Sequence, residues 1–141
     1  MKYQKWPKRD PIKNYFPVPN EVFLLGLSPG ELAVYSYLLF CEDRNTYQCW
    51  PSFKTIGKAT GMSTNTVRKY VRMLEERGLI TTEPTSITTR AGQKRNGNLL
   101  FTIRPIQEAV EQFHQQQMEK ISLDVQRKKA SGTKVRQEHP A

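Results

Sequence analysis

Apolar residues recur every three or four positions over residues 29–41, a spacing that places them on one face of a helix. Ser28 precedes this stretch and Pro29 occupies its first position, which is typical of a helix start. Residues 20–25 predict a short helical turn ahead of it. Residues 1–19 contain four prolines among basic and aromatic residues, so they predict an extended arm and not a helix.

Two further helical stretches lie close together in the middle of the chain. One covers residues 53–59 after Ser52, and the other begins at Ser63 and ends at Gly78. Serine is a favoured N-cap, so both starts are well marked. Only residues 61–62 separate the two stretches, and two helices joined by a short turn that contains glycine form a helix-turn-helix.

After these helices the pattern becomes typical of β-structure. Residues 79–82 and 87–89 are rich in β-branched side chains, and residues 99–103 form a further apolar run, so each predicts a strand. The loop between the last two, residues 90–98, contains three cations and the Asn-Gly pair of a hairpin turn. Two helices followed by a hairpin with a basic tip predict a winged helix.

The end of the chain predicts one more helix, over residues 105–125. Ile106, Val110 and Phe113 are expected to pack on the winged-helix core, because they follow the last strand directly. The expected fold is therefore mainly α with a small β-hairpin (α+β): a winged helix-turn-helix with an extra C-terminal helix. Its segments are a basic arm (1–19), the winged helix-turn-helix domain (20–104), the C-terminal helix (105–125) and a flexible tail (126–141).

The charge of the chain is concentrated in the predicted winged helix. The 141 residues suit one domain and exclude a large multi-domain enzyme. They carry 22 Lys and Arg against 13 Asp and Glu, a formal net charge of +9. Residues 52–104 hold ten of these cations against three Glu, a net +7, whereas residues 105–141 are almost neutral. A polyanion is therefore the expected partner, and it should contact the middle of the chain.

Neither a membrane span nor a catalytic motif is found in the sequence. No run of 18 apolar residues is present, and no apolar segment of a secretory signal follows the basic amino terminus, so we expect a cytoplasmic protein with no membrane partner. Cys41 and Cys49 lack metal-binding spacing, so we expect both to be reduced and at least one to be buried. Nucleotide-binding, nucleophile-elbow and zinc-protease motifs are missing, so we expect no enzyme activity, cofactor, metal ion or small-molecule substrate.

Residues 49–80 resemble a family of winged helix-turn-helix proteins. The family pattern is CWPS, a short helix, GxS, TV and LExxGLI, and this chain has Cys49-Trp50-Pro51-Ser52, Gly61-Met62-Ser63, Thr66-Val67 and Leu74-Glu75-Glu76-Arg77-Gly78-Leu79-Ile80. Such proteins are bacterial and phage regulators, and replication initiators of plasmids and conjugative elements. Residues 16–23 also look like the start of initiator-type domains from mobile elements of Gram-positive bacteria.

The resemblance implies sequence-specific binding of double-stranded DNA, in a transcriptional regulator carried on a mobile element and associated with the bacterial nucleoid. Replication initiation or maintenance of a plasmid or conjugative element is the alternative within the same fold. A protein- or RNA-interaction module is the alternative from another class. Interaction faces of that class tend to carry mixed charge or exposed apolar residues, and the net +7 of residues 52–104 argues against it.

The second helix of a helix-turn-helix lies in the major groove, with its N-terminal residues on base edges. Turning the apolar residues inward leaves a polar and cationic face outward, with no acid before Glu75. Asn65 has the amide groups that meet adenine and Arg68 can meet guanine or phosphate, whereas later residues are expected to hold the backbone. The alternative is a merely solvated helix face. The candidate set on this helix is Ser63, Thr64, Asn65, Arg68, Lys69 and Arg72.

Two further candidate sets flank this helix. Free backbone N–H groups at the start of the preceding helix suit a phosphate, although Ser52 can also be a plain N-cap. The cations of the wing loop can reach an adjacent minor groove or the backbone, the alternative being a solubilising hairpin tip. Trp50 is expected to pack internally. The sets are Ser52, Lys54 and Thr55 at the helix start, and Arg90, Lys94, Arg95, Asn96 and Asn98 in the wing.

The C-terminal helix also predicts an oligomer. Ile121 and Val125 project from a segment rich in Gln and Glu, and a lone helix with so few apolar contacts is marginal in water. We therefore expect a weak homodimer through residues 105–125. A dimer would also bring a second recognition helix to the DNA, because one alone reads few base pairs.

Overall fold

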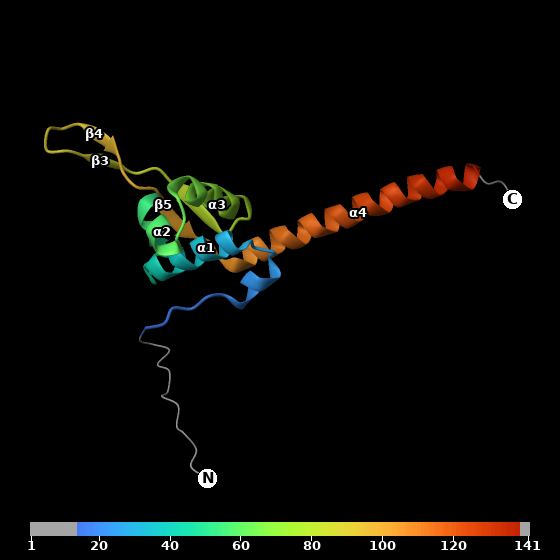
Figure 1. Ribbon diagram of the computed structural model, residues 1–141, viewed down its shortest axis with the longest axis horizontal. Helices are drawn as coiled ribbons and strands as arrows, with labels where there is room; N and C mark the ends of the chain where they lie inside the picture. The colour runs from blue at the N-terminus through green and yellow to red at the C-terminus, as the bar shows by residue number, and fades with distance from the viewer. Residues whose placement is uncertain (1–13, 139–141) are drawn as a thin grey trace, which may run out of the picture.

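The computed structural model describes residues 14–138, with side chains as far as residue 131. The N-terminal half holds three α-helices, and most of the strands come after them (Figure 1). The elements in chain order are the 3-10 helix η1 (Asn20–Leu24), α1 (Pro29–Cys41), β1 (Gln48–Cys49), α2 (Phe53–Thr60), α3 (Thr64–Glu76), β2 (Ile80–Glu83), β3 (Ser86–Thr88), β4 (Lys94–Asn96), β5 (Leu100–Ile103) and α4 (Ile106–Glu138).

The helix starts follow the predicted caps. Ser28 forms a capping box with Glu31 at the start of α1, and the Oγ atoms of Ser52 and Ser63 accept backbone N–H groups at the starts of α2 and α3. These caps use N–H groups that a helix start otherwise leaves unpaired. Gly61 ends α2 in the left-handed conformation, φ +73°, which allows the sharp turn into α3.

Apolar side chains from the three helices and the sheet form one core. Leu38 of α1, Ile56 of α2, Val67 and Leu74 of α3 and Phe101 of β5 are fully buried in it. The predicted apolar stripes of the helices therefore face one another and the sheet. Cys41 and Cys49 are free thiols and Cys49 is buried, as expected.

An ion pair fixes the end of α3 against the start of α1. Arg77, the C-cap of α3, pairs with the buried carboxylate of Glu31 and donates through Nη1 to the carbonyl of Leu25 at 2.9 Å. Burial alone raises the pKa of Glu31, but the hydrogen bonds from Arg77 and Ser28 and the charge of Arg77 outweigh it, and the pKa lies below its usual value. This pair orients α3 relative to α1.

The wing is built from two separate sheets. Strands β1, β5 and β2 form an antiparallel sheet in that order, in which Phe101 pairs with Cys49 on one side and Thr82 on the other. Strands β3 and β4 form a second, two-stranded sheet that projects from the body (Figure 1).

The prediction of a loop over residues 90–98 is wrong in its length. Its second half contains β4, so the turn is confined to residues 89–93, where the N–H of Gly92 donates to the carbonyl of Thr89 at 2.9 Å. The Asn-Gly pair lies at the base of the hairpin, where the N–H of Gly97 donates to the carbonyl of Thr85 at 2.8 Å. The Asn-Gly rule misplaced the turn because Gly92, φ +80°, supplies the left-handed residue that the tip requires.

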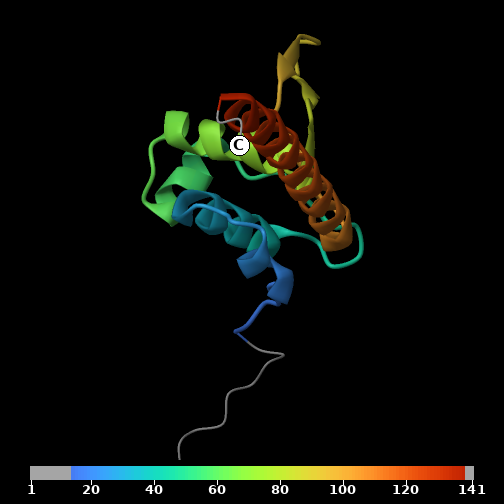
Figure 2. The same cartoon turned by 90° about the vertical axis from the view of Figure 1, so that its right-hand side faces the viewer.

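The C-terminal helix α4 extends further than the sequence indicated. Its base packs on the core through the fully buried Ala109 and the partly buried Ile106, Val110 and Phe113, as predicted. The helix then continues to Glu138, so most of the segment expected as a tail from residue 126 is helical. That segment is rich in Lys, Arg, Gln and Ala, which are strong helix formers, and this propensity outweighs the lack of a core. The far part of α4 projects away from the body (Figure 1), and it lies in front of the other helices when that end faces the viewer (Figure 2).

Most of the predicted arm, residues 1–13, lies outside the described residues, and residues 14–19 carry no helix. No helix between residues 14 and 138 has the length and apolar character needed to cross a membrane. The architecture is the α+β fold that was predicted, a winged helix-turn-helix with an extra C-terminal helix.

Candidate nucleic-acid interface

The predicted recognition helix is α3, and its candidate residues lie on its exposed face. Thr64, Asn65, Arg68, Lys69 and Arg72 are all exposed, whereas Val67, Val71 and Leu74 form the buried stripe. These five residues all lie in the first three turns of α3. The exposed face is therefore polar and cationic, as the spacing indicated.

The exposed face of α3 has two parts. Because successive helical residues are rotated by about 100°, Asn65, Lys69 and Arg72 lie opposite the buried stripe. Arg68 is turned towards α2, and its guanidinium lies 5.6 Å from the ring centroid of Phe53. This cation–π contact restrains Arg68 without using its N–H groups, which remain available to an acceptor.

The serines and threonines at the two helix starts are partly committed to capping. Ser63 Oγ accepts the N–H of Thr66 at 3.2 Å, and Ser52 Oγ accepts the N–H of Thr55 at 3.0 Å. The hydroxyls of Ser52 and Thr55 also lie 2.9 Å apart. The plain N-cap role of Ser52 is therefore present, and exposed Lys54 carries the charge at the start of α2.

Two neighbouring hollows are lined by members of each of the three predicted sets. Arg68, Arg72 and Glu75 of α3 line a hollow of about 250 Å³, and Ser52 and Asn98 line another of about 170 Å³. The side chains of Phe53 and Leu99 line both hollows. The exposed face of α3, the start of α2 and the base of the wing are thus continuous.

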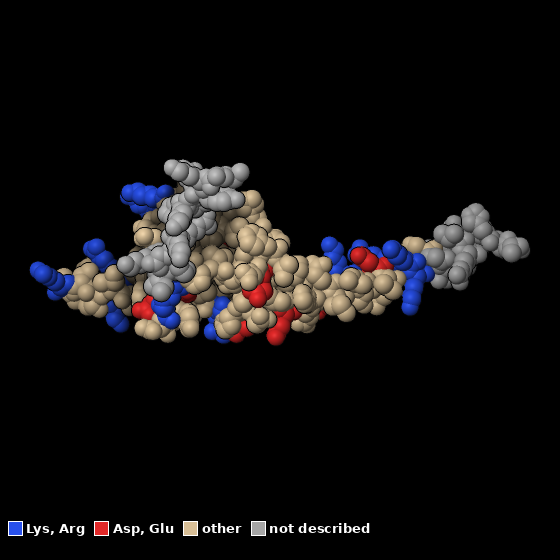
Figure 3. Space-filling model, turned by 90° about the horizontal axis from the view of Figure 1, so that it is seen from below, with Lys and Arg blue, Asp and Glu red and all other residues tan. Residues whose placement is uncertain are grey.

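The cations of the wing do not share one face. Arg95 pairs with Ile87 and Lys94 pairs with Thr88 in the β3–β4 ladder, so the two cations point to opposite sides of the hairpin. Arg90 lies in the turn at its tip. Figure 3 shows Lys and Arg side chains gathered at this end of the molecule.

The two wing asparagines differ in their surroundings. Asn96 is an exposed member of β4, paired with Ser86. Asn98 lies at the base of the wing, where its Nδ2 donates to the carbonyl of Trp50 at 3.1 Å. The amide of Asn98 therefore holds the start of β5 against the end of β1.

Trp50 is a surface residue that the sequence reading assigned to internal packing. Its side chain is 54% exposed, and it follows buried Cys49 and directly precedes Pro51 and Ser52 at the start of α2. The alternation of a strand predicts this outcome, because adjacent side chains point to opposite faces and Cys49 faces the core. The backbone of Trp50 adjoins the base of the wing, because its carbonyl accepts the amide of Asn98.

Acidic side chains appear on α3 only at its C-terminal end. Glu75 and Glu76 are exposed there, and Glu75 accepts a hydrogen bond from the hydroxyl of Thr82. The cations of α3 thus precede its acids along the helix, and Glu75 lines the same hollow as Arg68 and Arg72. Among the residues that the structure describes, His, Cys, Asp and Glu form no group of three that could hold a metal ion.

The comparisons with known proteins agree with this geometry at the level of the motif. Residues 25–80 match the model of a family described as a helix-turn-helix domain, and this range covers α1, α2 and α3. No curated protein matches the chain.

Several solved structures are similar to the chain. A possible transcriptional regulator from Methanosarcina mazei Go1 has 17% identity and a TM-score of 0.48, with 73% of this chain and 80% of that chain covered. A MarR-like transcriptional regulator from Thermotoga maritima has 20% identity and a TM-score of 0.42, covering 88% and 82%. MepR of S. aureus in a DNA complex has 14% identity and a TM-score of 0.41, covering 84% and 85%. The similarity to a helix-turn-helix domain is confined to residues 25–80, less than half of the chain.

Proposed function

We propose that the chain binds double-stranded DNA sequence-specifically and acts as a transcriptional regulator on a mobile element, in the bacterial cytoplasm at the nucleoid. The observation that carries the proposal is the continuous surface formed by α3, the start of α2 and the base of the wing. Its α3 part carries Arg68, Lys69 and Arg72, and the first acid along this helix is Glu75, at the edge of the same surface. The helix-turn-helix match over residues 25–80 supports the same function.

In this proposal the residues of α3 divide into base readers and backbone contacts. Asn65 lies in the first turn, where a recognition helix meets base edges, and its amide can pair with adenine. Arg68 is held over Phe53 and can meet guanine or a phosphate. Lys69 and Arg72 lie further along the helix and hold phosphates.

The first experiment measures affinity for a site selected from random duplexes, as a function of salt. If Arg68, Lys69, Arg72 and the wing cations neutralise phosphates, the slope of log affinity against log salt should lie at roughly −4 to −7, since each contact contributes about −0.9. A flat salt dependence would reject this surface as a phosphate-binding surface.

The second experiment separates readers from backbone contacts. Lys69→Ala should weaken binding to all sequences alike, and Asn65→Ala should relax preference at one base pair at a cost of about 1–3 kcal/mol. Lys128→Ala, at an exposed position of α4 far along the chain from the candidate interface, is the matched control and should leave both properties unchanged. If the two α3 variants change affinity and base preference in the same way, the division of α3 into base readers and backbone contacts is wrong.

Replication initiation or maintenance of a plasmid or conjugative element would use the same surface, so the arrangement of selected sites distinguishes the roles. Repeated sites favour an initiator, and a palindrome favours a dimeric regulator. A protein- or RNA-interaction module would show no preference for duplex DNA.

The proposal includes a weak homodimer through α4. Met118, Ile121 and Val125 are exposed and spaced so that they share one face of the projecting helix. Such an apolar row on a helix without a core of its own suits a second copy of the same helix.

A further inference from the structure

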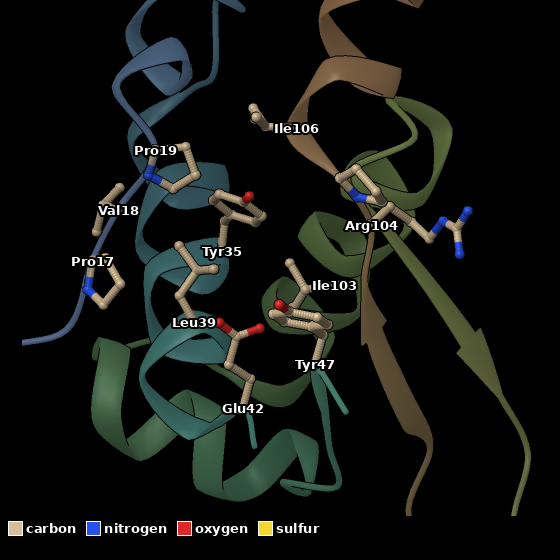
Figure 4. Close-up of a pocket in the computed structure, with 11 residues that line it drawn as sticks. Pro17, Val18, Pro19, Tyr35, Leu39, Glu42, Tyr47, Ile103, Arg104 and Ile106 are labelled. Atoms are coloured by element: carbon tan, nitrogen blue, oxygen red, sulfur yellow. The ribbon is translucent and has the colours of Figure 1, made fainter. Parts of the chain in front are cut away.

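A pocket lies on the side of α1 that faces residues 17–19 and the junction between β5 and α4. Its volume is about 460 Å³, which is within the usual range for sites that bind small molecules. Figure 4 shows the pocket between the N-terminal segment and the start of α4. Its walls are mainly apolar, with Pro17, Pro19, Tyr35, Leu39, Ile103 and Ile106 among the lining residues.

One carboxylate stands in this apolar lining. The side chain of Glu42 is only 6% exposed, and its Oε1 accepts Nη1 of Arg44 at 3.1 Å. Its other oxygen, Oε2, is buried and has no hydrogen-bond partner among the described residues. A buried charged acceptor without a donor is costly, so this atom is the natural anchor for a ligand.

The surroundings of Glu42 favour a positive partner. Glu42 is the C-cap of α1, where the helix dipole is negative and a cation is stabilised. Burial raises the pKa of Glu42, an effect that Arg44 partly offsets. Burial, followed by the charges of Glu42 and Glu21, raises the pKa of Tyr35 to about 12, so its hydroxyl stays protonated at neutral pH.

The chain's own nearby cation does not fill this position. Arg104 is bound to Glu108, with Nη2 and Nε of the guanidinium 2.9 and 3.1 Å from the two carboxylate oxygens. Figure 4 shows its side chain pointing away from the pocket. The described part of the chain therefore leaves Oε2 of Glu42 to an external donor.

Tyr47 is held at the pocket wall by a strained turn. Its φ is +58°, a left-handed value that is unusual for a bulky residue. Its N–H donates to the carbonyl of Asp43 at 2.7 Å, and its carbonyl accepts the N–H of Ile103 at 2.8 Å. Such strain persists where surrounding structure fixes it, and here it presents an aromatic ring beside Glu42.

We propose that this pocket binds a small organic monocation, an amine or amidine with an apolar or aromatic body. Its N–H group donates to Oε2 of Glu42, and its body packs against the prolines and the rings of Tyr35 and Tyr47. A ligand with an N–H donor fits better than a quaternary ammonium, because only the former satisfies the unpaired acceptor. The aromatic rings also favour a cation through their negative faces.

The test compares tryptamine with tryptophol, a neutral analogue in which a hydroxyl replaces the ammonium. Both are titrated into the full chain and followed by backbone amide NMR shifts. Tryptamine should bind at least about tenfold more tightly, with shifts around Tyr35, Glu42 and Tyr47. Glu42→Gln should abolish this preference, and Glu83→Gln, an exposed acid on β2, should preserve it.

Tyr47→Gly gives a second readout that keeps the Glu42 side chain and removes the ring beside it. Glycine relieves the left-handed φ and removes the ring, so the variant should stay folded and bind both compounds several-fold more weakly. The proposal fails if the wild-type chain binds the two compounds equally, if Glu42→Gln retains the preference, or if the shifts map away from the pocket.

Discussion

The Glu31–Arg77 pair shows how a single contact can orient α3. Glu31 is fully buried at the start of α1, and Arg77 ends α3. Arg77 also donates through Nη2 to the carbonyl of Gly26 at 3.2 Å, so its guanidinium joins α3 to the segment before α1. Removing one partner of a buried pair leaves the other charge without compensation, which costs more than the pair contributes.

Arg77→Ala should therefore lower the free energy of unfolding by about 3 kcal/mol, measured by urea denaturation. The variant leaves Glu31 buried without its counter-ion. Arg104→Ala is the matched control, since its pair with Glu108 is exposed and its loss should leave stability almost unchanged. Equal effects of the two variants would mean that the Glu31–Arg77 pair does not fix the helices.

The stability that the Glu31–Arg77 pair contributes should decrease at low pH. The folded-state pKa of Glu31 lies below 4.5, the usual value for a glutamate, so its ionised form stabilises the fold above pH 4.5. That contribution is lost as the pH falls through the folded-state pKa. The stability advantage of the wild-type chain over Glu31→Gln should therefore narrow on acidification below pH 4.5, measured by thermal unfolding at several pH values. An advantage that is constant with pH would contradict the assignment.

Gly57 illustrates a requirement that the sequence did not reveal. It lies inside α2, where glycine is unfavourable, and a Cβ built on it would lie 2.5 Å from the carbonyl oxygen of Met62. That carbonyl belongs to the turn of the helix-turn-helix, and Met62 donates its N–H to the carbonyl of Gly57 at 2.9 Å. The turn folds directly over the helix at this position.

Gly57→Ala should destabilise the domain by about 1–3 kcal/mol, because backbone must move to admit the methyl group. Chemical denaturation measures the change, and Lys58→Ala, at the exposed neighbouring position, should be nearly neutral. A neutral Gly57→Ala would show that the turn can shift without cost.

Among the elements, the sequence predicted those that depend on local pattern. The caps at Ser28, Ser52 and Ser63 and the apolar spacing placed α1, α2 and α3 correctly, because both signals act within one or two turns. The sequence placed the turn of the wing wrongly, because the position of that turn depends on how β3 pairs with β4 and on the left-handed Gly92. The candidate interface was also predicted only where it depends on local pattern. The spacing of the α3 residues predicted that they are exposed. The role of Asn98 could not be predicted, because it depends on a contact with Trp50, which is distant in the sequence.

The separate β3–β4 sheet should be the least stable element of the domain. Two-stranded hairpins without a packed face are marginal in water, and both strands are exposed along their length. Their amides should exchange with deuterium roughly a hundredfold faster than those of β5, which is paired on both sides. Specific DNA should slow exchange in β3–β4 if the wing contacts it. Equal protection of the two sheets without DNA would contradict this expectation.

At the scale of the whole molecule, the basic wing and the projecting part of α4 lie at opposite ends (Figure 1). The 33 residues of α4 give a helix about 50 Å long, at about 1.5 Å per residue. Only its base is packed, through residues such as Ala109 and through Gln112, whose Nε2 donates to the carbonyl of Glu76 at 2.6 Å. The sequence showed the weak apolar stripe beyond this base but placed its end too early.

The last prediction concerns what this projecting helix does. A lone helix with exposed Met118, Ile121 and Val125 gains stability by burying that face against a second copy. The full chain should therefore form a weak dimer in sedimentation experiments, and Ile121→Glu should shift it to monomer. A chain that ends at Gln117 should also be monomeric and remain folded, because it keeps the packed base of α4. On a palindromic site the full chain should bind two copies cooperatively and the shortened chain should not. If the full chain and both variants are monomers even on DNA, α4 serves only to stabilise the domain through its base.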